Sequence, residues 1–305
     1  MRALVAGATG FVGRRLAAAL VRDGHEVRCL VRNPERAGDL AAAGCELVVA
    51  DLAATNDALV GTLDGVDVAY WLVHMMSEPG YADPERAAAA AFARAASVAG
   101  TERLVYLGGL GDDPNVSPHL RSRHATAEAL AADGPPLTYF RAAMVIGAGS
   151  ESFVLLKAVA ERLPLVPSNE WLRRRTQPIG IRDTVRYLRA APSVPESRGR
   201  EVQIGGPRVY THLELVDLMA RELGRRSKRK LSVFGATPGA VSAGAAIVTR
   251  GDERVAAELT LSLVADTIVT DPSGAEPFGI DPEPIPIALQ RALADEERER
   301  ERVPA

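Results

Sequence analysis

The chain has 305 residues, of which 47% are hydrophobic and 25% are charged, and its formal net charge is −3. These values are typical of a folded globular protein that is large enough to bury a substantial core. They argue against a nucleic-acid-binding protein, because a phosphate-binding surface normally produces a clear basic excess.

The cysteine content and the lengths of the apolar runs indicate the cellular compartment of the protein. The cysteines are Cys29 and Cys45, and both lie in or beside apolar segments. We expect buried thiols in a reducing compartment, neither a disulfide scaffold nor a metal site. Three glycines and then Arg14 and Arg15 interrupt the N-terminal apolar run, which is unlike a signal peptide. No run approaches the roughly 20 apolar residues that span a bilayer, so we predict a cytoplasmic protein without a membrane partner.

The first half of the sequence alternates between short apolar runs and helical patterns. The runs that predict strands cover residues 3–6, 26–31, 46–50, 66–73, 103–107 and 137–140. Helices are predicted between them, for example at 11–23 and in the alanine-rich stretch 84–99. Nearly continuous apolar strands separated by helices indicate a parallel sheet covered on both faces. The predicted fold is therefore α/β, a Rossmann-type doubly wound parallel sheet.

Between the first predicted strand and helix, the turn GATGFVG carries glycines at positions 7, 10 and 13. In a dinucleotide site such glycines allow the tight turn, the close approach of the pyrophosphate and the close packing of helix on strand. The free N–H groups of the helix then face the anion. The residues that we expect to contact the cofactor here are Gly7, Ala8, Thr9, Gly10, Phe11, Val12 and Gly13.

The end of the second predicted strand suggests which dinucleotide binds. NAD sites carry an acidic residue there that binds the ribose 2′-hydroxyl, whereas this sequence reads LVRNPER. The guanidinium groups of Arg32, Arg36 and Arg14 suit a 2′-phosphate, so we favour NADP(H) over NAD(H). Asp51 and Leu52 follow the third strand and are expected beside the adenine, although an aspartate at this position can also cap the next helix.

After residue 150 the regular alternation ends. The predicted elements are a helix at 151–162, a strand leading into a helix over QPIGIRDTVRYL, a strand at 200–205, and a helix at 212–224 with Thr211 as its N-cap. The tail DEERERER has opposite charges at helical spacing and predicts a solvated, fraying helix end.

These elements divide the chain into two parts. We assign residues 1–150 to a dinucleotide-binding Rossmann domain, which is completed by late strands around 176–205. Residues 151–175 and 206–305 are assigned to a smaller substrate lobe at the C-terminal side. Ligands of such folds bind outside the carboxyl ends of the strands, where a lobe can cover them.

Four segments together resemble a known superfamily: AGATGFVG at the N-terminus, VRNPER after the second strand, ADL after the third and VYLGG at the fifth. They are similar to the short-chain dehydrogenase/reductase superfamily and, more narrowly, to its atypical branch of NmrA-like NAD(P)-binding proteins. The resemblance covers residues 1–147 and extends weakly beyond them. RAAMVIGAG resembles the family segment whose backbone reaches the nicotinamide carboxamide, which implies contacts from Ala143, Met144 and Val145.

The sequence departs from that family where carbonyl reductases carry their catalytic residues. The family has a serine at the end of the fifth strand, and this chain reads Leu107-Gly108-Gly109 there. The family's Tyr-x-x-x-Lys pair corresponds to HLRSR, which places His119 at the tyrosine, Ser122 at the serine before the lysine, and Arg123 at the lysine. The usual proton transfer by tyrosine is therefore not available.

Ser117 is a favourable N-cap and Pro118 suits the first helical position, so His119 should lie in the first turn and share a face with Arg123. The helix dipole and the nearby arginines disfavour an imidazolium. We expect a neutral His119 that donates a hydrogen bond to a developing alkoxide, or a solvent-facing histidine without a role. Arg123 would hold the nicotinamide ribose or a substrate anion, or form a surface salt bridge.

Other polar residues have either a functional or a structural interpretation. His74 follows the fourth strand and is expected to line the site, and Tyr81 could supply the missing phenol. His124 should pair with Glu128. A metal site is not expected, because His119 and His124 point apart and no suitable third ligand accompanies them. The arginines at 173–175 and the basic cluster RRSKRK at 225–230 are read as surface charge before any anion site.

Two functions from different classes follow. The first is an NADPH-dependent oxidoreductase that transfers hydride to a small, partly apolar acceptor such as a quinone or an activated alkene. The second is a non-catalytic NADP(H)-binding sensor or assembly module. Both functions predict a small-molecule ligand, and both allow a homodimer. Neither function predicts a nucleic acid or a membrane as a partner.

Overall fold

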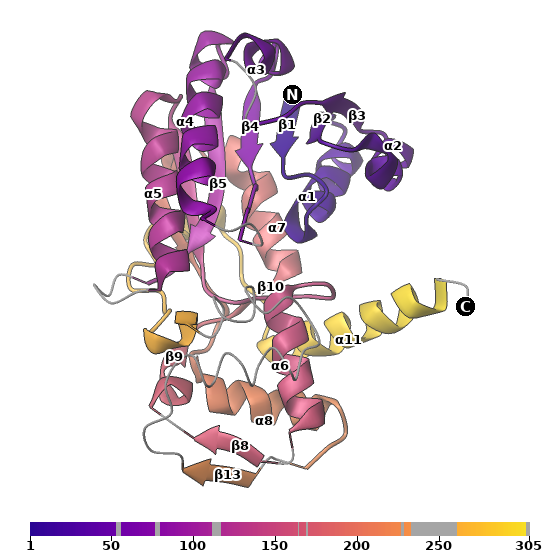
Figure 1. Cartoon of the computed structure of the whole chain (residues 1–305), viewed down its shortest axis with the longest axis vertical. Coiled ribbons are helices and arrows are strands. Elements are labelled where there is room, and N and C mark those ends of the chain that lie inside the picture. Colours follow the sequence, from indigo (N-terminus) through magenta and orange to yellow (C-terminus); the bar gives the residue numbers. More distant parts are fainter. Residues whose placement is uncertain are drawn as a thin grey trace.

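A computed structural model describes residues 1–52, 56–76, 80–111, 117–163, 165–168, 170–226, 229–232 and 261–302. The central sheet and its helices form one half of the molecule, and α6, α8 and α11 form most of the other half (Figure 1). Residues 227 and 228 of the basic cluster lie outside the described residues.

Seven strands form one sheet in the order β11-β6-β5-β4-β1-β2-β3, and each neighbouring pair is parallel. The strands are β1 Arg2–Ala6, β2 Glu26–Val31, β3 Glu46–Val49, β4 Val68–Trp71, β5 Arg103–Gly109, β6 Leu137–Ala142 and β11 Glu201–Ile204. The predicted doubly wound α/β fold is confirmed. The fourth strand is shorter than the predicted 66–73, because Val66 closes a turn to Leu63 and the chain leaves the sheet after Trp71.

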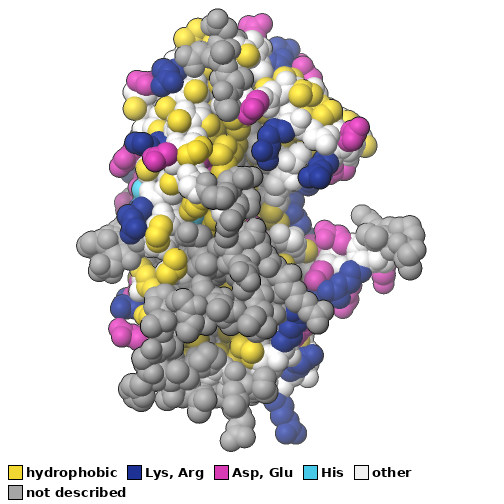
Figure 2. All heavy atoms as spheres, in the orientation of Figure 1, with side chains coloured by type: hydrophobic (Ala, Val, Ile, Leu, Met, Phe, Trp, Pro, Cys, Tyr) yellow, Lys and Arg dark blue, Asp and Glu magenta, His cyan; other side chains and the backbone are white. Residues whose placement is uncertain are grey.

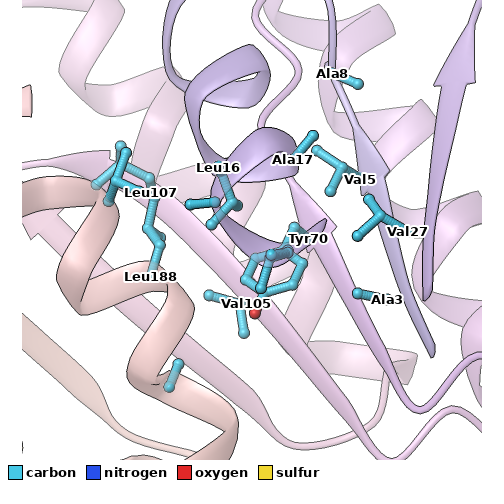
Figure 3. Close-up of a cluster of buried hydrophobic side chains, with 14 of the residues drawn as sticks. Ala3, Val5, Ala8, Leu16, Ala17, Val27, Tyr70, Val105, Leu107 and Leu188 are labelled. Atoms are coloured by element: carbon cyan, nitrogen blue, oxygen red, sulfur yellow. The ribbon is translucent and has the colours of Figure 1, made fainter. Parts of the chain in front are cut away.

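Helices cover both faces of the sheet. The helices that pack on one face are α1 Phe11–Arg22, α2 Gly38–Ala42 and α7 Ile181–Ala190. Those on the other face are α3 Asn56–Leu63, α4 Ala82–Val98 and α5 Pro118–Asp133. Figure 3 shows part of the first core, where Leu16 of α1 and Leu188 of α7 meet Val105 of β5. Each fully buried leucine contributes about 2 kcal/mol to folding.

The lobe has its own apolar core, built by α6 Glu151–Arg162, α8 His212–Glu222 and α11 Ile285–Arg302. Its strand pairs are β7 Val145–Ile146 with β10 Ile179–Gly180, β9 Arg175–Thr176 with β12 Tyr210–Thr211, and β8 Leu165–Ser168 with β13 Arg229–Ser232. Short 3-10 turns are η1 Pro34–Ala37, η2 Trp171–Arg173, η3 Ala191–Ser193, η4 Pro195–Ser197, η5 Ser262–Val264 and η6 Glu276–Phe278.

The chain passes between sheet and lobe repeatedly. After α6 it returns to the sheet as α7 and β11, and then it builds α8 in the lobe. After α8 it returns again, and Phe278 packs against Phe140 of β6 and Tyr187 of α7. The last helix, α11, then buries Ile285 and Leu289 in the lobe core.

Surface charge is mixed. On the described part of the face in Figure 2, basic and acidic side chains are interspersed. None of the helices in the described part of the chain has both the length and the apolar character needed to cross a membrane.

Candidate functional site

A cavity of about 730 Å³ lies between the sheet and the lobe. Its walls come from the segments that follow β1, β2, β3, β4, β5 and β6, together with parts of α5, α6 and α8. This is the carboxyl edge of the parallel sheet, where doubly wound folds bind their ligands.

The glycine turn forms one wall of this cavity. Gly7 has a φ of 82°, and a Cβ atom there would overlap the carbonyl group of Leu72. A Cβ atom on Gly13 would overlap the carbonyl oxygen of Gly7, so α1 approaches the turn this closely only with glycine. The N-cap of α1 is Gly10, which has no side chain that could accept a hydrogen bond from the first amides of the helix. The first amides of α1 are thus left for an anionic group such as a pyrophosphate, and the turn fits a dinucleotide.

The predicted cofactor residues fall into two groups. Those that line the cavity are Gly7, Thr9, Gly10, Phe11, Val12, Gly13, Arg32, Asp51, Leu52, Ala143, Met144 and Val145. Ala8 and Arg36 do not line it. Ala8 is fully buried in the core that α1 shares with the sheet. Arg36 is exposed, and its carbonyl oxygen accepts a hydrogen bond from Arg14.

The arginines near the second strand have different tasks. Arg14 donates to the carbonyl oxygen of Thr9 at 3.0 Å and pairs with Asp39, so it fastens the glycine turn to η1 and α2. Arg32 is exposed at the cavity wall. Of the three arginines Arg14, Arg32 and Arg36, Arg32 is the one that lines the cavity.

A buried carboxylate organises the region beyond β4. Glu85, in the first turn of α4, is fully buried and accepts a hydrogen bond from the backbone N–H of Met75 at 2.9 Å. His74 Nδ1 lies 3.4 Å from the same carboxylate oxygen, and Arg123 Nη1 lies 3.9 Å from the other. Burial raises the pKa of Glu85, but the hydrogen bond with His74 and the charge of Arg123 bring it below its ordinary value.

His74 and His119 lie side by side at the cavity wall, with their ring planes tilted by 41°. Their ring centroids are 5.0 Å apart, and both residues line the cavity. Burial, His74 and Arg123 together lower the pKa of His119 to about 2. Burial also lowers the pKa of His74, against the opposing effect of Glu85. Both imidazoles are therefore neutral near pH 7, and the carboxylate favours the His74 tautomer with hydrogen on Nδ1.

Arg123 is held rigidly on the same face of α5. It donates to the carbonyl oxygen of Leu107 and lies over the ring of Tyr106, 5.0 Å from its centroid. Its Nη1 is buried and makes no hydrogen bond with any described residue. Arg123 lines the cavity, while this nitrogen faces the buried Glu85 carboxylate at 3.9 Å.

Three predicted polar residues lie elsewhere. Ser122 is buried and does not line the cavity, and neither does Tyr81, whose ring meets the edge of His74. The predicted pairing of His124 with Glu128 is wrong. Because α5 packs against β6, His124 Nδ1 accepts from the Tyr139 hydroxyl at 3.1 Å, and Nε2 donates to a backbone carbonyl oxygen at 3.0 Å.

At the end of β5, where the family has a serine, the side chains of Tyr139 and Leu120 lie close to Gly108 and Gly109. A Cβ atom on Gly108 would press on the ring of Tyr139, and one on Gly109 would overlap the side chain of Leu120. A side chain at either position would therefore require Tyr139 of β6 or Leu120 of α5 to move.

Sequence reasoning missed two residues of this region. Glu85 follows Asp83 and Pro84 at the start of an alanine-rich helix, and an acid in the first turn is readily explained by the helix dipole. His212 directly follows the N-cap Thr211, and a residue in that place is readily explained as part of the helix start. His212 lines the lobe end of the cavity together with Thr176 and Thr267.

Cys29 and Cys45 are free and buried, as predicted. In the part of the chain that the structure describes, no three His, Cys, Asp or Glu side chains come together to hold a metal ion.

Comparison with known proteins links this geometry to cofactor binding. The family described as NAD(P)H-binding matches residues 7–143, which include the glycine turn and the ends of β2 to β6. A reductase of Streptomyces griseus subsp. griseus, named (4-alkanoyl-5-oxo-2,5-dihydrofuran-3-yl)methyl phosphate reductase, is 30% identical over 230 residues, which cover 73% of this chain and 74% of the relative. Photosystem II assembly factor Ycf39 of Trieres chinensis is 24% identical over 77% of this chain and 73% of its own length.

Solved structures show the same fold. Triphenylmethane reductase of Citrobacter sp., in its complex with NADP(H), superposes with a TM-score of 0.74 at 18% identity, over 96% of this chain and 100% of that chain. At this level of identity the likeness concerns the arrangement of sheet and lobe.

Proposed function

The chain belongs to the NAD(P)H-binding family of atypical short-chain dehydrogenases and reductases, and on that basis we propose that it is an NADP(H)-dependent oxidoreductase. Its substrate would be a small, partly apolar hydride acceptor held between the sheet and the lobe. The observation that carries the proposal is a single cavity that joins the glycine turn and Arg32 to the His74–His119 pair. The reductase names of one relative and one structural neighbour agree with this chemistry.

Bound NADPH would supply a hydride from the nicotinamide ring. The amides of the first turn of α1 would bind the pyrophosphate, Arg32 would bind the 2′-phosphate, and Arg123 would hold the nicotinamide ribose or the acceptor. The backbone at Ala143, Met144 and Val145 would contact the carboxamide. Together these residues would hold the cofactor close to the acceptor.

His119 donates a hydrogen bond to the oxygen on which charge develops. With a pKa of about 2, it remains neutral and cannot act as a strong acid. Protonation of His74 is stabilised by Glu85, so His74 can take up or release a proton beside His119. Acceptors that need little acid assistance, such as quinones and activated alkenes, fit this site better than simple ketones.

A screen of NADPH oxidation over ketones, quinones and enones tests the proposal. We expect turnover on quinones or enones, a fall of about 10² in kcat for His119→Ala, as for loss of one hydrogen-bond donor to a developing charge, and an unchanged Kd for NADPH. His25→Ala, at a half-exposed histidine that does not line the cavity, is the matched control. Tight NADPH binding without turnover on any acceptor class would contradict an oxidoreductase.

The alternative is a non-catalytic NADP(H)-binding module. The missing serine and tyrosine support it, as does the similarity to an assembly factor. It predicts cofactor binding that is insensitive to His119→Ala, together with no turnover, so the same screen separates the two functions.

A further inference from the structure

The lobe end of the cavity has a chemistry of its own. It is formed by Thr176 of β9, His212 at the first position of α8, and Thr267, which forms a β-bridge with Thr176. The apolar side chains of Leu155 and Leu263 line the same cavity. The cofactor residues after β1 and β2 belong to the sheet side of the cavity, so this end is left for the acceptor.

His212 is a buried polar side chain whose Nε2 has no hydrogen-bond partner among the described residues. It is only 8% exposed. Close by, the Thr267 hydroxyl and the Thr176 hydroxyl are hydrogen-bonded to each other at 2.9 Å. A buried polar atom without a partner costs free energy, and a ligand that reaches it recovers that cost.

Thr176, His212 and Thr267 carry no formal charge, and among the described residues of the lobe Glu151 of α6 is a charged one that lines the cavity. Arg175, the neighbour of Thr176 in the chain, is turned to Asp266, with side-chain hydrogen bonds of 2.9 and 2.7 Å. Burial lowers the pKa of His212 to about 4, so the imidazole is neutral at physiological pH. Among the described residues that line the lobe end, none is a lysine or an arginine. An anionic group would lose its hydration here without gaining an ion pair.

We infer that the lobe end binds a neutral oxygen group, a carbonyl or a hydroxyl, of an otherwise apolar substrate, with His212 as its hydrogen-bonding partner. The inference rests on the proposed function for the identity of the substrate as the hydride acceptor, but binding at this end does not require hydride transfer. It makes His212 a specificity-determining residue, and it distinguishes this cavity from one that selects phosphorylated or carboxylated compounds.

A dead-end complex tests binding apart from catalysis. With NADP⁺ bound, oxidised naphthoquinone cannot receive a hydride, so its Kd can be measured by calorimetry in the full-length protein. The comparison uses naphthoquinone and its anionic sulfonate with the wild type, with His212→Leu, and with His212→Gln, whose amide can take the place of Nε2. His25→Leu is the matched control, and thermal melting together with the NADP⁺ Kd checks that each variant is folded.

We expect His212→Leu to weaken naphthoquinone binding about tenfold, the loss of one buried hydrogen bond, while His212→Gln and His25→Leu bind within about threefold of the wild type. The sulfonate should bind at least about tenfold more weakly than naphthoquinone. Equal Kd values for His212→Leu and the wild type, no binding of naphthoquinone to the wild type, or equal binding of the sulfonate would each overturn the inference. Binding that depends on His212 without any turnover with NADPH would uphold it and refute the oxidoreductase function.

Discussion

Glu85 is a fully buried carboxylate beside the cavity. A carboxylate with no exposed surface is tolerated only when hydrogen bonds and opposite charges replace its water. Here these are the Met75 amide, the Thr126 hydroxyl at 3.3 Å, His74 and Arg123. The arrangement couples α4 and α5 through one charge, so the carboxylate positions the two cavity residues His74 and Arg123.

We predict that Glu85→Gln lowers kcat by about tenfold to a hundredfold and leaves the NADPH Kd unchanged. The amide keeps the shape of the side chain but no longer stabilises a protonated His74. The pH profile of kcat should therefore shift to lower pH at its acidic limb, which a purely structural role would not produce. Steady-state kinetics across pH measures both effects, and a profile that only scales down would argue against a positioning role.

Arg32 allows a prediction about the cofactor. Replacing Arg32 with alanine should weaken NADPH binding by about tenfold to a hundredfold, as for loss of one charge-assisted phosphate contact, and should leave NADH binding nearly unchanged. Fluorescence titrations with both nucleotides measure the ratio of the two Kd values. Arg36→Ala is the matched control, since Arg36 is exposed but does not line the cavity. An unchanged ratio in Arg32→Ala contradicts the NADP(H) preference.

At the scale of elements, the first turn of α5 decides where His119 lies. Ser117 is its N-cap and accepts a hydrogen bond from the Leu120 amide at 3.2 Å, and Pro118 occupies the first helical position. Leu120 is buried and anchors the turn. The cap, the proline and the anchor together fix the start of the helix that carries both His119 and Arg123.

Ser117→Ala should therefore destabilise the protein by about 1 kcal/mol, the usual cost of losing an N-cap, and should raise the KM of the acceptor. Ser117→Asp keeps a capping oxygen and is expected to retain both properties. Urea unfolding and steady-state kinetics measure the two effects. An alanine variant that matched the wild type in both would show that the proline and the packing of Leu120 suffice.

The elements also show what the sequence could reveal. Strands that are buried on both faces leave continuous apolar runs, so β1 to β6 and the glycine turn are readable from local patterns. The cap at Ser117 is equally local. By contrast, the pairing of Glu85 with His74, and the packing of His124 on Tyr139, arise between segments that meet only after folding. Nothing in the sequence around Glu85 or His212 distinguishes these side chains from surface residues, because their burial is decided by helices packed from elsewhere.

For the whole molecule, buried neutral histidines predict sensitivity to acid. The pKa values of His119 and His212, about 2 and about 4, lie below the ordinary 6.5. Between pH 6.5 and 4 the unfolded chain thus binds protons that the folded chain does not, and the free energy of unfolding falls as the pH drops. The slope is about 1.4 kcal/mol per pH unit for each such group.

Denaturant unfolding at about pH 7 and about pH 5 measures this loss. His212→Gln should reduce the difference between the free energies of unfolding at the two pH values, because one of the histidines with a lowered pKa is removed. His25→Gln, at a half-exposed position, should show the wild-type difference. If His212→Gln lost as much stability on acidification as the wild type, the imidazole would not be neutral in the folded protein.

The repeated passage of the chain between sheet and lobe has a consequence for protein engineering. β11, α7 and Phe278 all return to the sheet after parts of the lobe have been built. No single cut in the chain therefore separates the sheet and its helices from the lobe, and a lobe transplanted from a relative would need several junctions at once. Substitutions of single residues on the cavity wall are therefore a simpler way to change the specificity of this fold than replacement of the whole lobe.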